Sequence, residues 1–378
     1  MNYFVIAGEA SGDLHAANLI RSINAMDPSS RFTAMGGDLC RDAGATLLRH
    51  YRDMAFMGVI NVITHLSKIA SNLHAAYDFL DHERPDALIL VDYPSFNLKV
   101  ARYCKDRGLP TKVFYYISPK LWAWKSYRIR SIKRYVDAML LILPFEQEYY
   151  RSRGYSPAYY VGNPLCDAIE QWRATGHGAT FRQRHELDQR PIIALLPGSR
   201  TQEIKGCLPT MLNACRHLLD THHVLIAGAP GQPGQLYQTL APNCKVIFDD
   251  TYSLLDNALA AIVNSGTATL ETALIGCPQV VVYNIALPHL ASLVKPLIIK
   301  TKYVSLVNIV AGSQVVRELV AADFTTSNVR HEIDRLLTDD TYRSTVLNGY
   351  RQVRDLTGDS GGSQRAAKRI LQLINHHA

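Results

Sequence analysis

The sequence is poor in several features that would assign it to a common structural class. Charged residues make up only 19% of the chain, below the usual quarter or so, while apolar residues make up 47%. This composition excludes a disordered protein and supports sizeable cores in a chain of 378 residues. No apolar run reaches the roughly 18–20 residues of a membrane-spanning helix, because the best candidate, 279–300, contains Pro288, Lys295 and Pro296.

Cysteine pairs and metal-binding motifs are also missing. The seven cysteines are scattered without a C-x-x-C spacing, and the fourteen histidines form no H-E-x-x-H motif. This pattern is typical of a reducing compartment and argues against a disulfide framework or a zinc site. The first residues run directly into the strand-like segment 4–7, without a signal-peptide pattern. We therefore expect a cytosolic protein that uses no metal and no cofactor.

The charge of the chain indicates what it binds. A formal net charge of +7 favours anionic partners such as phosphorylated metabolites, nucleic acid or an anionic membrane surface. Residues 120–134 contain six basic residues, no acidic residue, and both Trp122 and Trp124. A solvated helix face is the ordinary explanation, but Trp beside Lys and Arg is also typical of membrane interfaces. We expect no nucleic-acid partner, because no helix-turn-helix, RRM or KH pattern is present.

Short apolar runs alternate with turns and helical stretches along most of the chain. Such runs are typical of buried parallel strands. Two series of them, separated by a polar stretch at 176–190, predict an α/β fold with two doubly wound, Rossmann-like domains facing a central cleft. We expect domains at 1–175 and 186–345, and C-terminal helices at 346–378 that pack back on an N-terminal domain. Ligands of such folds bind at the carboxyl ends of the strands.

Two strand ends in the second half have the composition of phosphate-binding turns. In the first, Gly198, Ser199 and Arg200 follow the apolar run 192–196, and a helix is expected from about Thr201. Glycine lets backbone N–H groups approach an oxyanion, the helix start presents further donors, and arginine adds a fork that suits phosphate. The alternative is a tight turn in which Ser199 caps the helix and Arg200 is solvated.

The second turn begins at Ser265, and Gly266 and Thr267 open the next helix. Glu271 lies one turn inside that helix, where a carboxylate could accept hydrogen bonds from both hydroxyls of a ribose. The alternative is a helix start capped by Thr267, with Glu271 favourable near its amino end. Two such turns in one domain suit a nucleotide diphosphate better than either turn alone.

Strand ends in the first half carry acidic residues instead. The loop 8–13 lacks the G-x-G-x-x-G spacing of a dinucleotide site, and its carboxylates, Glu9 and Asp13, suit sugar hydroxyls better than pyrophosphate. Asp92 follows the apolar run 87–91. A carboxylate there, flanked by apolar residues, could have a raised pKa and act as a general base. A capping or structural aspartate fits the position equally well.

A helix with a 3.6-residue apolar period is predicted over 56–80. Its amino end, from Met54 to Ile60, is apolar all round. This end is predicted to be either a deep part of the core or an exposed patch that contacts lipid.

Several longer motifs are specific enough to indicate a family. The most specific are SPKLWAW, LLPGSR and SGTATLE. The full set is AGEASGD (7–13), Met57-Gly58, VDYPSFN (91–97), YYISPKLWAW (115–124), LPFE (143–146), VGNPL (161–165), LLPGSRTQE (195–203), SGTATLE (265–271), YVSLVNIVAG (303–312) and QRAA (364–367). With these motifs the whole chain resembles the lipid-A-disaccharide synthases, family-19 glycosyltransferases of Gram-negative bacteria with a GT-B fold. It departs from the family pattern at Asn61, Ser95, Asn163 and Val307, and we assign no catalytic role to Ser95 or Asn163.

The resemblance implies an inverting hexosyltransferase. It moves 2,3-diacylglucosamine from UDP-2,3-diacylglucosamine to the 6-hydroxyl of 2,3-diacylglucosamine 1-phosphate, and releases the lipid A disaccharide and UDP. The expected catalytic residues are Asp92, as the base, and Glu9. The residues expected to bind the UDP donor are Gly198, Ser199, Arg200, Glu203, Ser265, Gly266, Thr267, Glu271, Asn308 and Glu318. Expected to bind the acceptor are Ser11, Asp13, Asn97, Lys125 and Arg128. Expected to contact acyl chains or the membrane are Met54, Phe56, Met57, Val59, Ile60, Trp122 and Trp124.

The same resemblance implies where the protein works and with what. It implies a peripheral protein on the cytoplasmic, anionic face of the inner membrane, and a homodimer that could exchange its C-terminal helices. Two other functions stay open. Another GT-B enzyme of UDP-sugars, an epimerase or a soluble-sugar transferase, would act on unacylated UDP-GlcNAc. A non-catalytic UDP- or lipid-binding protein would release no UDP.

Overall fold

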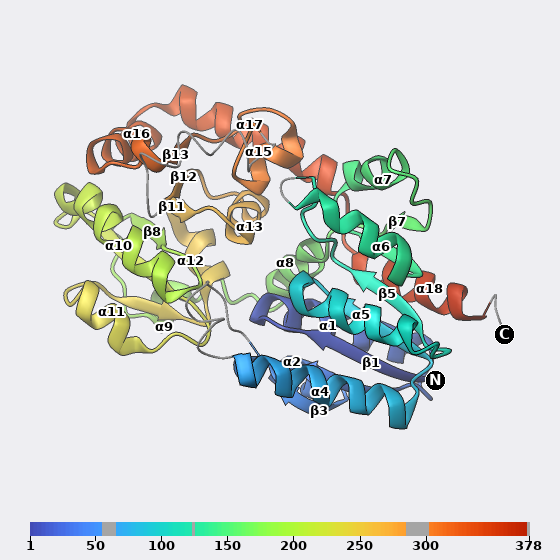
Figure 1. The fold of residues 1–378 in the computed structure, drawn as a ribbon. Helices are drawn as coiled ribbons and strands as arrows, with labels where there is room; N and C mark the ends of the chain where they lie inside the picture. Colours follow the sequence, from blue (N-terminus) through green and yellow to red (C-terminus); the bar gives the residue numbers. More distant parts are fainter. Residues whose placement is uncertain (55–65, 123–124, 285–301, 376–378) are drawn as a thin grey trace. The chain divides into compact units, whose positions relative to one another are not determined.

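The computed structural model describes residues 1–54, 66–122, 125–284 and 302–375 (Figure 1). The chain forms two compact units. Unit 1 contains residues 1–164 and 359–378, and unit 2 contains residues 165–358. Each unit is built on a fully parallel sheet with helices between the strands. Two parallel-sheet α/β domains are thus confirmed.

Unit 1 has a seven-stranded sheet with the order β3-β2-β1-β4-β5-β6-β7. Its strands are β1 (Asn2–Ala7), β2 (Arg31–Gly36), β3 (Ala45–His50), β4 (Ala87–Val91), β5 (Lys112–Tyr116), β6 (Ala138–Leu141) and β7 (Ala158–Tyr160). Its helices are α1 (Ala10–Met26), α2 (Asp38–Asp42), η1 (Tyr51–Asp53), α4 (Leu66–Glu83), α5 (Pro94–Asp106), η2 (Ser126–Arg128), α6 (Ile129–Tyr135), α7 (Pro144–Arg151) and α18 (Gly362–Asn375).

The core of unit 1 lies on both faces of this sheet, as expected for a parallel sheet covered by helices. Tyr3, Val5 and Ala7 of β1 belong to one buried cluster, together with residues of α1 and α18. Phe4 and Ile6 point to the opposite face and belong to a second cluster with residues of α4 and α5. The period-two alternation therefore divides an unbroken apolar run between two cores.

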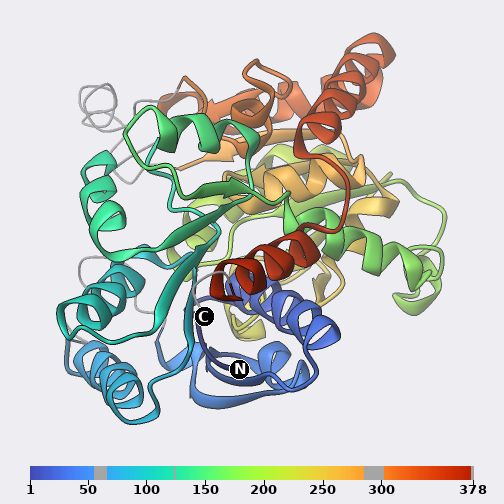
Figure 2. The same cartoon turned by 90° about the vertical axis from the view of Figure 1, so that its right-hand side faces the viewer.

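The last helix completes one of these cores. Helix α18 packs against α1, and Ala366, Ala367 and Ile370 are fully buried there (Figure 2). Arg365 Nε donates a hydrogen bond of 2.7 Å to the carbonyl of Val161. The apolar face of α18 is therefore part of unit 1, although 194 residues of unit 2 precede Asp359 in the sequence.

Unit 2 has a six-stranded sheet with the order β10-β9-β8-β11-β12-β13. Its strands are β8 (Ile192–Leu196), β9 (His223–Gly228), β10 (Val246–Phe248), β11 (Ala258–Asn264), β12 (Gln279–Tyr283) and β13 (Glu318–Val320). Its helices are α8 (Pro164–Ala174), α9 (Phe181–Arg184), α10 (Thr201–Cys215), η3 (Arg216–Leu218), α11 (Gly234–Leu240), α12 (Thr251–Asn257), α13 (Thr267–Ile275), α15 (Leu306–Ala311), η4 (Ala321–Asp323), α16 (Thr326–Thr338) and α17 (Asp340–Thr357).

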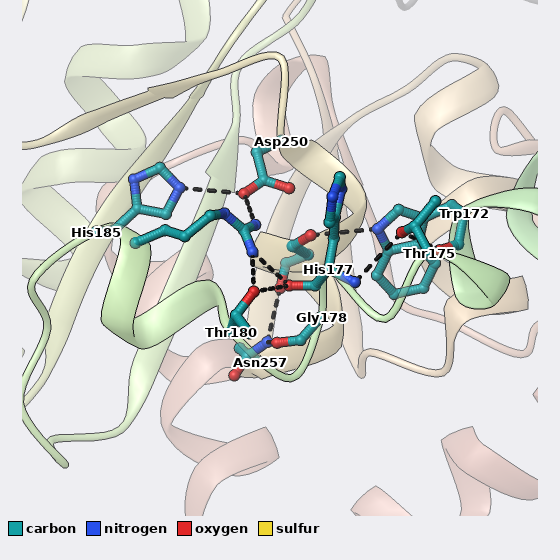
Figure 3. Close-up of polar contacts among 10 residues, drawn as sticks. Trp172, Thr175, His177, Gly178, Thr180, His185, Asp250 and Asn257 are labelled. Atoms are coloured by element: carbon teal, nitrogen blue, oxygen red, sulfur yellow. Dashed lines mark hydrogen bonds and ion pairs between the residues drawn. The ribbon is translucent and has the colours of Figure 1, made fainter.

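The first unit boundary differs from the expected one, because the polar stretch 176–190 is bound to unit 2 instead of linking two domains (Figure 3). Asn257 Nδ2 donates to the Gly178 carbonyl at 2.9 Å, and His185 Nε2 lies 3.1 Å from a carboxylate oxygen of Asp250. Boundary prediction failed here because polar composition does not distinguish a linker from a loop that is hydrogen-bonded to a domain.

The expected segment 346–378 is likewise divided. Most of it up to residue 358 is helix α17, which belongs to unit 2. Gln279 Nε2 donates to the Tyr350 hydroxyl at 3.3 Å, and Arg354 Nη2 donates to the Leu274 carbonyl at 2.6 Å. Only the residues after 358 lie in unit 1. In the described part of the chain, no helix is both long enough and apolar enough to cross a bilayer.

Asp13 connects two elements of unit 1. Its side chain is only 2% exposed. Oδ1 accepts hydrogen bonds from the backbone N–H groups of Gly37 (2.7 Å) and Cys40 (3.2 Å), and Oδ2 accepts one from Leu39 at 3.1 Å. A carboxylate on α1 thus satisfies the backbone donors at the start of α2, which have no partner inside that helix. Asp13 thus has a structural role, and its expected contact with the acceptor stays a prediction.

We expect Asp13→Ala to lower the free energy of unfolding of unit 1 by about 1–3 kcal/mol, because it leaves buried N–H groups without an acceptor. Urea unfolding followed by circular dichroism measures the change. Asp42→Ala is the matched control, since that side chain is 62% exposed, and its effect should stay within about 0.5 kcal/mol. Equal effects of the two substitutions would contradict the structural role of Asp13.

Candidate active site

The order of the strands reverses between β1 and β4 in unit 1. From β1 the chain proceeds through β2 to β3 on one side, and then returns to place β4 on the other side of β1. The loops after β1 and β4 therefore leave in opposite directions, and this is where doubly wound folds bind ligands. Ala7 and Val91, the last residues of the two strands, are paired in register. Glu9 and Asp92 consequently lie at the same edge of the sheet, and both side chains are partly exposed.

The backbone at Asp92 has an unusual conformation. Asp92 and Tyr93 have φ angles of 44° and 46°, in the left-handed region that non-glycine residues seldom adopt. The Asp92 carbonyl accepts hydrogen bonds from Asn97 Nδ2 at 2.7 Å and from the Tyr115 hydroxyl at 2.5 Å. The Asp92 N–H donates to the Tyr116 carbonyl at 3.1 Å. Such local strain persists only where surrounding contacts hold it, and it is concentrated at functional sites.

Tyr93 joins three loops at this edge. Its ring lies directly over Gly8, where an added Cβ would be 2.3 Å from Tyr93 Cδ1. Its hydroxyl donates to the Met54 carbonyl at 2.7 Å. Burial, together with the nearby charge of Glu9, raises the pKa of Tyr93 to about 12. Sequence reasoning did not predict a role for Tyr93, because the only signal in the sequence was its position next to Asp92.

The residues expected to bind the acceptor have different environments. Asn97 is fully buried, and its side-chain NH2 donates to backbone carbonyls of the Asp92 loop, so it positions that loop. Its expected contact with the acceptor stays a prediction. Ser11 is exposed in the first turn of α1. Lys125 immediately precedes η2, has a φ of 53° and is partly buried. Arg128 Nη2 donates to Ser95 Oγ at 2.9 Å, which brings a guanidinium to the start of α5, next to the Asp92 loop.

Two of the motifs, YYISPKLWAW (115–124) and LPFE (143–146), contact each other in unit 1. Glu146, only 1% exposed, accepts a hydrogen bond from Trp122 Nε1 at 3.2 Å and one from the Leu143 N–H at 3.1 Å. The Trp122 ring also packs edge-on against Phe145. Burial raises the pKa of Glu146 to about 7, although these hydrogen bonds favour the charged form. The start of the basic stretch is thus bound to a buried carboxylate.

The expected lipid contacts are described only in part. Met54 is 1% exposed and belongs to a buried cluster of unit 1, so it is a core residue, and the expected membrane contact is corrected. Trp122 is partly buried. The remaining residues of that prediction lie outside the described residues; they are Phe56, Met57, Val59, Ile60 and Trp124.

Unit 2 has the same reversal of strand order, between β8 and β11. Leu196 and Val263 are paired in register near the ends of these strands. The turn at 197–200 and the turn at 264–266 therefore lie at one edge of the sheet, as the phosphate-binding prediction requires. Gly198 has a φ of 123°, which only glycine adopts readily.

The turn at 197–200 is bound by Glu203. The Ser199 and Arg200 N–H groups donate to Glu203 Oε2 at 3.0 and 3.3 Å, and Arg200 Nη1 donates to Oε1 at 3.1 Å. Arg200, not Ser199, is the residue that precedes helix α10. Gln232, in the loop after β9, was missed by sequence reasoning. Its side chain accepts a hydrogen bond from Thr201 Oγ1 at 2.9 Å and donates one to the Ser199 carbonyl at 3.1 Å.

The start of helix α13 is different. Gly266 is the residue that precedes it, and no side chain caps the helix, so the capping alternative for Thr267 is not observed. Ser265 Oγ donates to the Val304 carbonyl at 3.0 Å. Glu271 accepts a hydrogen bond of 2.7 Å from the Tyr252 hydroxyl. Burial raises the pKa of Glu271, and that hydrogen bond opposes the increase.

Asn308 and Glu318 support this region from inside unit 2. Asn308 is 0% exposed, and its Nδ2 donates to Glu318 Oε1 at 2.9 Å. Glu318 Oε1 also accepts from the Ser305 N–H at 2.8 Å. The two side chains thus hold the segment whose Val304 carbonyl binds Ser265. Both side chains therefore have an internal role, and their expected contact with the donor stays a prediction. Among the described residues, no group of three His, Cys, Asp or Glu side chains could hold a metal ion.

Solved structures with the same arrangement identify the fold class. A UDP-GlcNAc 2-epimerase from Neisseria meningitidis, solved with bound UDP-GlcNAc, superposes with a TM-score of 0.72 at 14% identity, over 98% of this chain and 100% of that one. The calicheamicin glycosyltransferase CalG4 superposes with a TM-score of 0.57 at 17% identity, over 100% and 99% of the two chains. The protein therefore has the GT-B fold of two parallel-sheet domains.

Sequence comparison assigns the family. The sequence model of the lipid-A-disaccharide synthetase family matches residues 3–370. A lipid-A-disaccharide synthase from Trichlorobacter lovleyi is 38% identical over 98% of this chain and 97% of its own length, and one from Myxococcus xanthus is 37% identical with the same coverage. The chain belongs to the lipid-A-disaccharide synthase family. The resemblance inferred from the motifs is confirmed.

The pH dependence of stability provides a test of the buried Glu146. Its pKa is about 7 in the folded protein against an ordinary 4.5, so the protonated form stabilises the fold at low pH, and this contribution is lost as the pH rises through about 7. Between pH 5 and pH 8 the wild type should lose about 2–3 kcal/mol relative to Glu146→Gln, which cannot titrate. Urea midpoints at both pH values measure this difference. Glu148→Gln, an exposed change on the same helix, should track the wild type. A stability difference that does not vary with pH would contradict the buried, raised pKa.

Proposed function

We propose that this protein is an inverting hexosyltransferase that transfers 2,3-diacylglucosamine from UDP-2,3-diacylglucosamine to the 6-hydroxyl of 2,3-diacylglucosamine 1-phosphate. The products are the lipid A disaccharide and UDP. Membership of the lipid-A-disaccharide synthase family over residues 3–370 carries this proposal. The chemistry of the two sheet edges agrees with it, since one edge has carboxylates and the other has phosphate-binding donors.

In unit 2, the donor diphosphate binds between the turn at 197–200 and the start of α13. Backbone N–H groups and the positive end of a helix stabilise the negative charge that builds on UDP as its bond to the sugar breaks. Arg200 adds a guanidinium to this environment. Glu271 accepts the ribose hydroxyls, and the Tyr252 hydroxyl holds its carboxylate in place.

In unit 1, Asp92 is the general base. It takes the proton from the 6-hydroxyl of the acceptor while that oxygen forms a bond to the anomeric carbon of the donor. The bond from that carbon to the phosphate oxygen breaks, and its electron pair leaves with UDP, so the configuration inverts. The left-handed backbone at 92–93 fixes where the base emerges from the sheet. Glu9, on the neighbouring strand end, orients the sugar hydroxyls, and Arg128 and Lys125 attract the acceptor phosphate.

The substrates carry acyl chains, so the enzyme has to work at a lipid surface. We infer that the basic stretch 120–134 binds the anionic inner face of the inner membrane, with roughly 1 kcal/mol for each charge near the surface. We also propose that the enzyme works as a homodimer. A UDP-GlcNAc epimerase is the second candidate only at the level of the fold, because two similar UDP-GlcNAc 2-epimerase structures are 14% and 12% identical to this chain.

The test is direct. The protein is incubated with UDP-2,3-diacylglucosamine and 2,3-diacylglucosamine 1-phosphate in mixed micelles, and both UDP and disaccharide are quantified. Equal amounts of the two products support the proposal. Conversion of unacylated UDP-GlcNAc to its epimer would support the alternative instead, and absence of UDP release with the acylated pair would refute the transferase.

Asp92→Asn should lower turnover at least about a hundredfold, the usual contribution of a general base. Binding of UDP should be unchanged, because the donor residues lie in unit 2. Asp86→Asn, at the other end of β4, is the matched control and should keep full turnover. Turnover of Asp92→Asn within threefold of wild type would remove Asp92 from the mechanism.

Arg200→Ala should weaken the binding of UDP by about 1.5–3 kcal/mol, the range of a hydrogen bond to a charged group. Titration calorimetry measures the dissociation constant. Arg216→Ala, an exposed change just beyond the carboxyl end of α10, makes the same change in net charge and should have no effect. An unchanged constant for Arg200→Ala would mean that 197–200 is only a turn.

A further inference from the structure

We propose that Glu203 competes with the diphosphate of the donor for the turn at 197–200, and that it swings aside when the diphosphate binds. The inference rests on the proposed function, because it concerns the same donor site. It replaces the expectation that Glu203 helps to bind UDP. Its carboxylate acts instead as an internal anion that lowers the affinity for UDP and assists its release.

The contacts of Glu203 are those of a bound anion. Oε2 accepts from two successive backbone N–H groups, those of Ser199 and Arg200, at 3.0 and 3.3 Å. Oε1 accepts from the Arg200 guanidinium at 3.1 Å. Two converging N–H groups at a helix start and an arginine fork are also the donors that a phosphate would use. A phosphate and this carboxylate cannot bind them together, because both would bring negative charge to the same few atoms.

The turn is shaped to admit the carboxylate. A Cβ added at Gly198 would lie 2.6 Å from Glu203 Oε2 and 2.7 Å from Glu203 Cβ. Any larger residue at this position would push the glutamate away from the backbone donors. At the second turn, no side chain within the described residues caps α13, which begins after Gly266. Competition is therefore confined to one of the two turns.

The carboxylate is also able to leave. The Glu203 side chain is 26% exposed and that of Arg200 is 49% exposed, so rotation of the glutamate towards solvent encounters no closed core. Arg200 then exchanges its carboxylate partner for a phosphate oxygen. When UDP leaves, Glu203 returns to the N–H groups of Ser199 and Arg200. These backbone donors therefore keep a hydrogen-bond acceptor after the product has left.

Titration calorimetry with UDP, inorganic pyrophosphate and uridine tests this competition in the full-length protein. Glu203→Gln, which keeps the side-chain length but removes the charge, should bind UDP and pyrophosphate at least threefold more tightly. Uridine, which lacks phosphate, should bind the variant and the wild type equally. Asp220→Asn makes the same change in charge at the opposite edge of the unit 2 sheet and should leave all three constants unchanged.

A second variant guards against a purely structural effect. Glu203→Asp keeps the charge but is too short to reach the Ser199 N–H, so it should also bind pyrophosphate more tightly than the wild type. If both variants bind UDP and pyrophosphate as the wild type does, or more weakly, the competition is refuted. Tighter binding of uridine as well would also refute it, because the effect would then not concern phosphate. Failure of the wild type to bind UDP at all would instead refute the proposed donor site.

Discussion

The reversal of strand order beside the first strand of each sheet is the constraint on which the site depends. Where two parallel neighbours send their loops in opposite directions, the loops cannot cover the strand ends, and backbone and side-chain groups stay available there. In unit 1 this position falls between β1 and β4, and in unit 2 between β8 and β11. The same geometry thus gives two different chemical environments, because glutamate and aspartate follow the first pair of strands while glycine, serine and arginine follow the second.

Many of the polar residues near these edges bind the protein itself. Asp13, Asn97 and Asn308 are buried, and each satisfies backbone groups of a neighbouring turn. Most buried polar groups in proteins are hydrogen-bonded, and the bonds that these three side chains make to the backbone fix the loops around them. Buried amides and carboxylates thus set the path of each loop, and Asp92 and Arg200, for which we propose contacts with the ligand, are more exposed.

The fold was largely predictable from the sequence, and the site was predictable in part. Parallel strands buried on both faces appear as unbroken apolar runs, and the residue after each run falls at the ligand-binding edge; this is why Asp92 and Arg200 could be placed. The internal roles of Asp13 and Asn308 could not, because their partners are backbone groups that approach only in the tertiary structure. Tyr93 was missed for the same reason, since its contact with Gly8 joins two loops that are far apart in the sequence. Met54 was ambiguous because an apolar residue at a helix entrance has the same pattern whether buried or exposed.

Helix α18 has a consequence for how the chain folds during synthesis. Unit 2 is continuous in sequence, whereas unit 1 is built from residues on both sides of it. The ribosome starts to synthesise unit 1 before unit 2 but completes it afterwards, because residues that cover α1 belong to helix α18. For the time needed to translate 165–358, the face of α1 that contains Leu19 and Ile23 lacks its native cover. A chain that ends before residue 366 would therefore leave this apolar face of α1 without its native cover, and such exposed apolar surface promotes aggregation.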